Sequence, residues 1–273
     1  MARMVRVGTV ELGGGKPLAL IAGPCVIGSR NDCMELAEAL AGLARECGIP
    51  FIFKASYDKA NRSSLRAFRG LGAESGLSIL REVRETFHVP VVTDVHGRDE
   101  VAAAAAAVDM LQIPAFLCRQ TDLILAAAGA GRPLNIKKGP FLAPWDMAPV
   151  VQKAASTGNQ ALCVTERGYT FGYNHLVADM RSLLVLQGMG YPVNFDATHS
   201  VQRPGGAGDH SGGDGAWAPA LARAAVATGA CDAVFVETYL SPDKALSDRE
   251  NSIPFDQLRR LWRELRQIDA IMD

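Results

Sequence analysis

The sequence predicts an α/β fold, a single (β/α)8 barrel that occupies residues 1–273. Short apolar runs recur eight times, and each is continuously apolar, which is typical of parallel strands covered on both faces. A stretch with helical periodicity follows each run, and eight such units close a barrel of this kind. The runs occupy residues 17–22, 50–54, 90–94, 110–113, 133–137, 161–165, 192–196 and 233–237.

The helical stretches follow from periodicity, capping and propensity. Ser29 and Asp32 form a capping signal ahead of the first helix, in which Leu36 and Leu40 share one face. The alanine-rich run 101–108 favours helix through propensity alone. The remaining helices are predicted to begin near residues 74, 98, 120, 145, 176, 216 and 255.

A doubly wound open sheet is the alternative arrangement of these elements. No G-x-G-x-x-G motif follows the first run, so a dinucleotide site is poorly supported. Residues 4–12 are predicted to form a hairpin at the bottom of the barrel. The glycine-rich stretch 203–213 lies between a strand and a helix, so it is predicted to be a functional loop instead of a domain boundary.

The composition excludes several classes of protein. A chain of 273 residues, 48% of them hydrophobic, is long enough to bury a large core. The net charge of −1 argues against nucleic acid or anionic lipid as a partner. The sequence has neither an apolar stretch that could span a bilayer nor the apolar core of a signal peptide, so we expect no membrane partner and a cytoplasmic location.

The six cysteines lack a CxxC pair and the density of a secreted disulfide scaffold, so we expect them to be reduced. Cys25 is unusual because it ends the stretch IAGPC, where the chain leaves the first strand and a side chain can reach into a cleft. The other five lie in apolar or helical segments and are typical of small buried hydrophobic residues: Cys33, Cys47, Cys118, Cys163 and Cys231.

Polar side chains follow all eight predicted strands at their carboxyl ends, where barrels of this class carry their active sites. Seven basic residues of this rim form a first candidate group: Lys54, Lys59, Arg62, Arg119, Lys137, Lys138 and Arg167. Such a concentration suits a substrate with several anionic groups. A solvated basic rim is the alternative, and Lys54 or Lys137 taken alone also suits a Schiff-base lysine if burial lowers its pKa.

A second candidate group combines a thiol, an imidazole and two carboxylates: Cys25, His199, Glu237 and Asp248. These residues follow the first, seventh and eighth strands, and the first and eighth strands are neighbours in a closed barrel. Such a mixed set suits Fe2+, Zn2+, Mn2+ or Co2+. Spacing alone leaves a buried or nucleophilic thiol open for Cys25, and a general base or a structural role open for His199.

Taken together, the motifs resemble the 3-deoxy-D-manno-octulosonate 8-phosphate synthases, also called 2-dehydro-3-deoxyphosphooctonate aldolases. These enzymes condense phosphoenolpyruvate with arabinose 5-phosphate in Kdo and lipopolysaccharide biosynthesis. The resemblance spans nearly the whole chain, through the stretches IAGPC, FKASYDKANRSS, TDVH, QIPAFLCRQTDL, NIKKGPFLAP, ERGYTFGYN, FDATHSVQRPGG and DKALSD. Metal-independent members carry asparagine at the first strand end and metal-dependent members carry cysteine, so Cys25 implies the metal-dependent class, with His199, Glu237 and Asp248 as further ligands.

The resemblance also implies roles for the other rim residues. Lys59, Lys137 and Arg167 are expected to hold phosphoenolpyruvate. Arg119 is expected to reach the sugar phosphate bound by a neighbouring subunit, which implies a homotetramer. Arabinose 5-phosphate is expected to contact Asn61, Arg62 and Ser63, with Gln112 in the polar wall. The implied catalytic residues are Lys54, Asp94, His199 and Asp248.

Two positions depart from the pattern of the resembling family. Tyr239 stands where many members have histidine, and Pro140 stands where glutamine is usual. Tyr239 is expected to change the surroundings of Glu237 and hence metal preference or rate. His210 is predicted to be a loop residue and His96 a residue of the site wall.

Three alternative functions stay open at this stage. The first is the sister condensation of phosphoenolpyruvate with erythrose 4-phosphate, against which the stretch KANRSS argues. The second is a sialic acid synthase, whose acceptor lacks the phosphate that Arg62 and Arg119 are expected to bind. The third is a barrel that binds phosphorylated sugars or a metal without catalysis, although holding so many polar groups in a cleft without a partner is costly.

Overall fold

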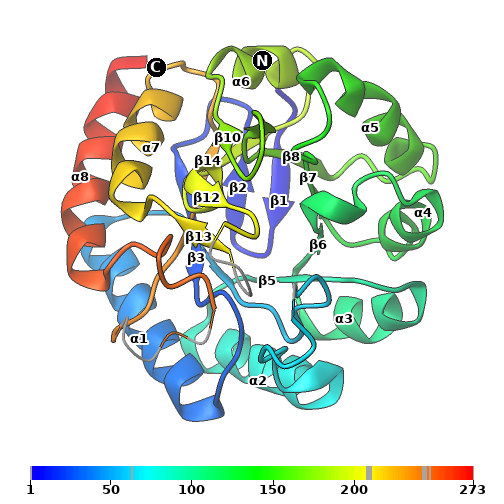
Figure 1. Cartoon of the computed structure of the whole chain (residues 1–273), viewed down its shortest axis with the longest axis vertical. Helices are drawn as coiled ribbons and strands as arrows, with labels where there is room; N and C mark the ends of the chain where they lie inside the picture. The colour runs from blue at the N-terminus through cyan, green and yellow to red at the C-terminus, as the bar shows by residue number, and fades with distance from the viewer. Residues whose placement is uncertain (1, 63, 207–210, 242–244, 246, 273) are drawn as a thin grey trace.

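In the computed structural model, residues 2–62, 64–206, 211–241, 245 and 247–272 are described. Eight parallel strands form a closed (β/α)8, or TIM, barrel inside a ring of helices (Figure 1). The first and last barrel strands pair in parallel, which closes the barrel and excludes the open sheet. In chain order the strands are β3 (Ala19–Gly23), β4 (Phe51–Lys54), β5 (Val91–Asp94), β6 (Met110–Ile113), β7 (Leu134–Lys137), β8 (Leu162–Glu166), β11 (Val193–Asp196) and β14 (Ala233–Glu237).

Among the described residues, eight α-helices surround the barrel: α1 (Arg30–Cys47), α2 (Gly72–Phe87), α3 (Val101–Ala107), α4 (Thr121–Gly129), α5 (Met147–Ala155), α6 (Arg181–Gln187), α7 (Ala218–Val226) and α8 (Phe255–Met272). Ser29 caps α1 as predicted, since its hydroxyl oxygen accepts the backbone N–H of Asp32 at 3.1 Å. The helix predicted to begin near residue 176 begins at Arg181. Residues 176–177 are instead taken up by β10 (Leu176–Val177), which pairs with β9 (Tyr169–Thr170) in a short hairpin.

Short elements connect the main ones. The 3-10 turns are η1 (Arg98–Glu100), η2 (Ala115–Leu117), η3 (Pro144–Asp146), η4 (His199–Val201) and η5 (Gly215–Trp217). The predicted helix starts near residues 98, 145 and 216 fall on η1, η3 and η5, which lead directly into helices. A further two-stranded pair, β12 (Gln202–Arg203) and β13 (Gly212–Gly213), lies in the predicted glycine-rich loop.

The predicted N-terminal hairpin is confirmed as β1 (Val5–Val7) and β2 (Val10–Leu12). Its four apolar side chains are buried and pack in one cluster with residues that lie early in the barrel strands, among them Ile21, Val92 and Met110. The hairpin therefore covers the amino-terminal end of the barrel, where Figure 1 shows it across the centre of the ring. The opposite, carboxyl-terminal end is left for polar side chains.

The six cysteines carry free thiols, as expected from their spacing. All are buried except Cys47, which is partly exposed at the end of α1. The described helices include none that is both long and apolar enough to cross a membrane.

Candidate active site

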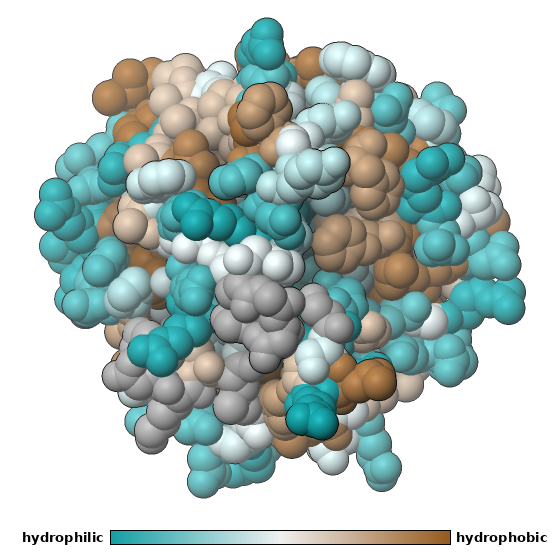
Figure 2. Space-filling model, in the orientation of Figure 1, coloured by the Kyte–Doolittle hydropathy of each residue, from teal (hydrophilic) through white to brown (hydrophobic). Residues whose placement is uncertain are grey.

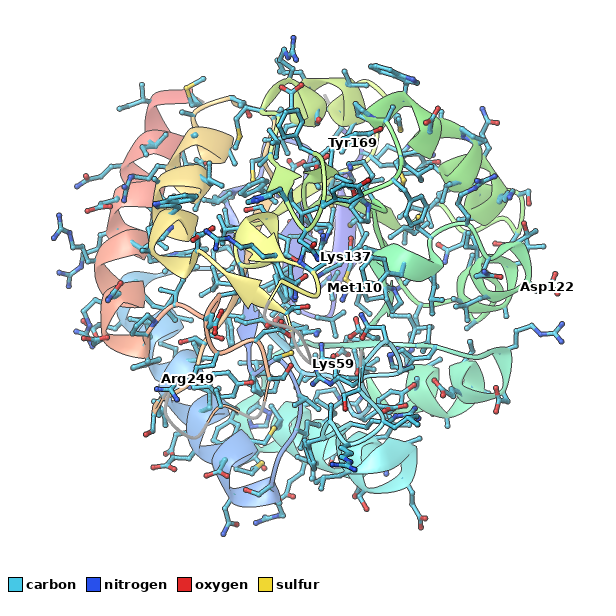
Figure 3. All side chains as sticks on the ribbon, viewed as in Figure 1. Lys59, Met110, Asp122, Lys137, Tyr169 and Arg249 are labelled. Carbon is cyan, nitrogen blue, oxygen red and sulfur yellow. The ribbon has the colours of Figure 1, made fainter. Side chains whose placement is uncertain are left out.

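A cavity of about 600 Å³ opens at the carboxyl ends of the barrel strands. Figure 3 shows Lys59 and Lys137 near the centre of the ring, whereas Asp122 projects at its edge. The barrel thus brings together most of the side chains that the sequence predicts for a site. The predicted residues that line the cavity are Lys54, Lys59, Asn61, Arg62, Asp94, Gln112, Lys137, Arg167, His199 and Asp248, and His96 joins them as expected.

Other predicted residues lie elsewhere. Arg119 is exposed just after η2. It is not one of the described residues that line the cavity. Lys138 belongs to the basic group predicted from sequence, but it is fully buried outside the cavity. Its Nζ donates to the carbonyl of Gly168 at 2.9 Å and lies 3.5 Å from Glu166 Oε1. Ser63 and His210 lie outside the described residues.

A thiol and two carboxylates meet beside the cavity. Cys25, Glu237 and Asp248 each bring one potential ligand atom to within 4.8 Å of the other two, and Cys25 Sγ lies 3.0 Å from Asp248 Oδ2. His199 borders this group, with its Nε2 3.5 Å from Glu237 Oε1. The structure thus brings three of the four predicted ligands together, and the fourth, His199, approaches the group through Glu237.

The chemistry of this group fits a divalent cation. Both carboxylate oxygens of Glu237 are buried and have no hydrogen-bond partner among the described residues. Burial raises the pKa of the Cys25 thiol, and the nearby carboxylates of Asp248 and Glu237 raise it further. A divalent cation would satisfy the unpaired oxygens and favour the thiolate, because oxygen and sulfur ligands of this kind bind Zn2+ and its neighbours.

Two lysines and a carboxylate form the floor next to the thiol. Lys54 Nζ donates to Ser56 Oγ at 2.8 Å and lies 3.3 Å from Asp94 Oδ2. Lys59 Nζ lies 3.9 Å from Asp94 Oδ2 and 4.0 Å from Glu237 Oε1, so it stands between the two carboxylates. Burial alone would raise the pKa of Asp94, but the charges of Lys54 and Lys59 outweigh it and hold the pKa well below its usual value.

Lys54 is paired, which bears on the Schiff-base alternative. Burial lowers the pKa of its ammonium group, and the Asp94 carboxylate opposes this shift. A Schiff-base lysine must present a neutral amine to a carbonyl carbon. Since the Lys54 ammonium is held by Asp94 and Ser56, the geometry favours an electrostatic role over covalent catalysis.

Asp196 connects the predicted phosphate-binding lysine to the predicted metal-binding histidine. Its Oδ2 lies 2.5 Å from Lys137 Nζ and 2.7 Å from His199 Nδ1. Asp196 belongs to the stretch FDATHSVQRPGG, and no role is predicted for it from the sequence. Its position at the end of β11, on the same rim as the other polar strand ends, is the signal that identifies it.

A second connection runs from Arg167 to Asp248 through Gln202. Arg167 Nη2 donates to Gln202 Oε1 at 2.9 Å, and Gln202 Nε2 donates to Asp248 Oδ1 at 2.7 Å. Arg167 Nη1 is buried without a hydrogen-bond partner in the described structure, and the same holds for Nη2 of Arg62. Two guanidinium groups in one cavity therefore have N–H donors left for an anionic ligand.

Gln112 lies in β6 and lines the cavity. Its Nε2 donates to Asp94 Oδ1, and its Oε1 accepts from Asn135 Nδ2 at 2.8 Å. Asn135 in turn accepts from the Thr165 hydroxyl at 2.8 Å. Gln112 is thus part of the polar wall, as expected, and its amide is used to fix Asp94.

The chain matches the DAHP synthetase I family over residues 3–273. It is also similar to curated proteins named 2-dehydro-3-deoxyphosphooctonate aldolase. The proteins from Geotalea daltonii and Geobacter metallireducens are each 54% identical over 272 residues, which cover 100% of both chains. The protein from Granulibacter bethesdensis is 55% identical over 270 residues, which cover 99% of this chain and 95% of that relative.

Proposed function

Since this chain belongs to the DAHP synthetase I family and, within it, to the 2-dehydro-3-deoxyphosphooctonate aldolases, we propose that it condenses phosphoenolpyruvate with D-arabinose 5-phosphate and water. The products are 3-deoxy-D-manno-octulosonate 8-phosphate and phosphate, so the enzyme is a C–C bond-forming synthase that serves Kdo and lipopolysaccharide synthesis. The observation that carries this proposal is the pair of buried guanidinium donors, from Arg62 and Arg167, that find no partner among the described residues and lie in one cavity.

The basic residues account for two anionic substrates in one site. Phosphoenolpyruvate carries up to about three negative charges and the sugar phosphate about two more, so both must be neutralised before their carbon atoms can approach. Lys59, Lys137 and Arg167 bind the phosphate and carboxylate of phosphoenolpyruvate. Lys54, held by Asp94, lies beside the reacting carbons and stabilises charge that develops there.

Arabinose 5-phosphate occupies the part of the cavity formed by the stretch KANRSS. Asn61 and Arg62 line the cavity there, and Arg62 Nε is fixed by the carbonyl of Phe68 at 3.0 Å. This bond leaves the Nη2 edge of the guanidinium for the sugar phosphate. Ser63, the third residue of the proposed subsite, lies outside the described residues, and Gln112 supports the wall.

The reaction forms one carbon–carbon bond. C3 of phosphoenolpyruvate attacks the aldehyde carbon of the sugar, water adds at C2, and the intermediate releases phosphate by cleavage of its C2–O bond. His199, Asp248 and Asp94 are placed to move the protons that these steps require, because all three face the cavity. The Asp196 carboxylate accepts from His199 Nδ1, so the Nε2 of the ring is directed toward Glu237.

We place the chain in the metal-dependent class. Cys25, His199, Glu237 and Asp248 would hold Fe2+, Zn2+, Mn2+ or Co2+. The Glu237 oxygens, which have no hydrogen-bond partner in the described part of the chain, support this assignment. When bound, such an ion supplies Lewis-acid polarisation of the sugar aldehyde or of the water. The metal bound in the cell depends on metal availability as much as on ligand type.

We further propose a homotetramer in which Arg119 contacts the sugar phosphate of a neighbouring subunit. Phe116, three residues before Arg119, is exposed, and so are Phe141, Trp145 and Phe171. A hydrogen bond from Thr170 N to Pro140 O joins the β9–β10 hairpin, which carries Phe171, to the segment that carries Phe141. Figure 2 shows apolar surface beside the central hollow, on the side where Figure 1 places α4. Light scattering on the purified protein, with the variant Arg119→Ala, tests this arrangement, and a monomer with full activity would exclude it.

Phosphate release tests the reaction. The protein is incubated with phosphoenolpyruvate and either arabinose 5-phosphate or erythrose 4-phosphate, before and after EDTA treatment, and with each metal added back. Activity with the five-carbon sugar alone supports the proposal, and loss with EDTA supports the metal-dependent class. Turnover of erythrose 4-phosphate would favour the sister reaction, and calorimetric binding without turnover would favour a binding protein.

A further inference from the structure

Tyr239 connects two segments that carry the thiol and a carboxylate of the proposed metal site. It lies two residues after Glu237, and its phenol is partly buried. Its hydroxyl oxygen accepts the backbone N–H of Cys25 at 3.1 Å, and the hydroxyl donates to the backbone carbonyl of Ser247 at 3.4 Å. One side chain therefore bridges the turn after β3 and the residue that precedes Asp248.

This bridge joins two segments that are far apart in sequence. Cys25 and Asp248 are 223 residues apart in sequence, yet Sγ and Oδ2 lie 3.0 Å from each other. The serine that Tyr239 contacts also joins them, because Ser247 Oγ lies 3.0 Å from Cys25 Sγ and donates to Asp248 Oδ2 at 2.9 Å. Moving the backbone of residue 247 therefore changes the distance between sulfur and carboxylate.

The backbone at Asp248 itself is held away from its preferred conformation. Its φ of +49° lies in the left-handed region, which a non-glycine residue adopts only where surrounding contacts impose it. The carbonyl of Asp248 accepts from the backbone N–H groups of Asn251 and Ser252 on its far side. On its near side, Tyr239 fixes the carbonyl of Ser247, so the segment is held from both directions.

We propose that Tyr239 is a positioning residue that sets the separation of the Cys25 sulfur and the Asp248 carboxylate through two main-chain hydrogen bonds, and thereby the affinity of the site for thiophilic divalent cations. This inference rests on the metal site of the proposed function. Groups that orient metal ligands from outside the coordination sphere typically change metal affinity by about 10- to 100-fold. An ion bound through sulfur and carboxylate together, such as Co2+ or Zn2+, depends on this separation more than an ion bound mainly through oxygen, such as Mn2+.

The test measures metal binding instead of turnover. Metal-free protein is titrated with Co2+, the thiolate-to-cobalt charge-transfer absorption is recorded, and Kd is obtained by competition with a chelator. For Tyr239→Phe, which removes one oxygen, we expect a Kd for Co2+ higher by about 10- to 100-fold and a weaker charge-transfer band. The Kd for Mn2+ is expected to rise less.

Tyr191→Phe is the matched control. Tyr191 is buried, and its hydroxyl also donates one hydrogen bond, to Gln160 Oε1 at 3.1 Å. It lies just before β11, at the opposite end of the barrel. We expect this variant to bind Co2+ as the parent protein does. A second variant, Tyr239→His, keeps a group that can accept or donate, and we expect an affinity between those of the parent and Tyr239→Phe.

Each outcome decides one of the two claims. Equal Co2+ affinity and an equal charge-transfer band in the parent protein and Tyr239→Phe would overturn the positioning role while the metal site stands. A parent protein without any thiolate–cobalt band would overturn the metal site and this inference with it. The condensation of phosphoenolpyruvate with arabinose 5-phosphate is assayed separately, so its failure is distinguished from both.

Discussion

His199 and Asp196 are joined by two hydrogen bonds within one turn of chain. The backbone N–H of His199 donates to Asp196 Oδ1 at 2.9 Å, and His199 Nδ1 lies 2.7 Å from Asp196 Oδ2. The same Oδ2 also holds Lys137. A single carboxylate therefore sets the orientation of an imidazole and the position of an ammonium group, and the proposed reaction uses these two groups for different tasks.

The first prediction concerns this carboxylate. Asp196→Asn replaces one acceptor by an amide that cannot hold both His199 and Lys137, so we expect kcat to fall by about 10- to 100-fold. The KM for phosphoenolpyruvate is expected to rise as well, because Lys137 loses its partner. Steady-state kinetics measure both, with Asp179→Asn as the control, since Asp179 forms only a surface pair with Arg181. Parent-like kinetics in Asp196→Asn would show that the connection has no catalytic role.

The second prediction concerns anion binding by Arg167. Arg167→Lys keeps the charge but loses the planar pair of N–H groups, one of which is fixed by Gln202 and one of which is unpaired in the described structure. We expect kcat/KM for phosphoenolpyruvate to fall by about 10- to 100-fold, the equivalent of one charge-assisted hydrogen bond. As a control, Arg181→Lys changes a residue of an exposed ion pair, and we expect it to leave kcat/KM for phosphoenolpyruvate unchanged. An unchanged kcat/KM in Arg167→Lys would exclude Arg167 from the binding of phosphoenolpyruvate.

The third prediction concerns the thiol. Cys25→Ser removes a soft ligand from a group whose remaining members are carboxylates and an imidazole, so we expect bound metal to fall well below one equivalent and activity to fall with it. Elemental analysis of the purified protein measures the metal. Cys47→Ser is the control, because Cys47 is partly exposed at the end of α1. If Cys25→Asn kept full activity in the presence of a chelator, the metal would not be essential in this protein.

The fourth prediction concerns stability and pH. Burial, with a contribution from Asp269, raises the pKa of Asp232 to about 6, although its Oδ2 accepts the backbone N–H of Val193 at 2.7 Å. Between pH 4 and 6 the Asp232 carboxyl is therefore protonated more fully in the folded state than in the unfolded state. As a result, the free energy of unfolding falls as the pH rises through this window. Its contribution to the free energy of unfolding is about 2 kcal/mol smaller at pH 8 than at pH 4.5.

Asp232→Asn removes this titration and keeps an oxygen for Val193. We expect the variant to be more stable than the parent protein at pH 8 and similar to it at pH 4.5. Urea unfolding at the two pH values measures the difference. A stability gain that is the same at both pH values would indicate that the charge of Asp232 is not its cause.

The sequence by itself determined the barrel and most of its rim. Eight continuously apolar runs predict eight strands buried on both faces, and all eight are present. Closure of the barrel pairs β14 with β3, and this pairing brings Glu237 beside Cys25 as predicted. These features follow from sequence because hydrophobic burial and strand order depend on residue type and chain order alone.

Only the tertiary structure decided which rim residues face the cavity and what holds them. Lys137 ends β7 and Lys138 follows it directly, yet Lys137 lies in the cavity and Lys138 is buried against Glu166 and Gly168. Successive side chains of an extended chain point to opposite sides, so neighbours in sequence have different surroundings. The roles of Asp196, Gln202 and Tyr239 depend on partners from other strands and loops. Hydrogen bonds of about 3 Å require a direction as well as a residue type, and the folded backbone supplies that direction.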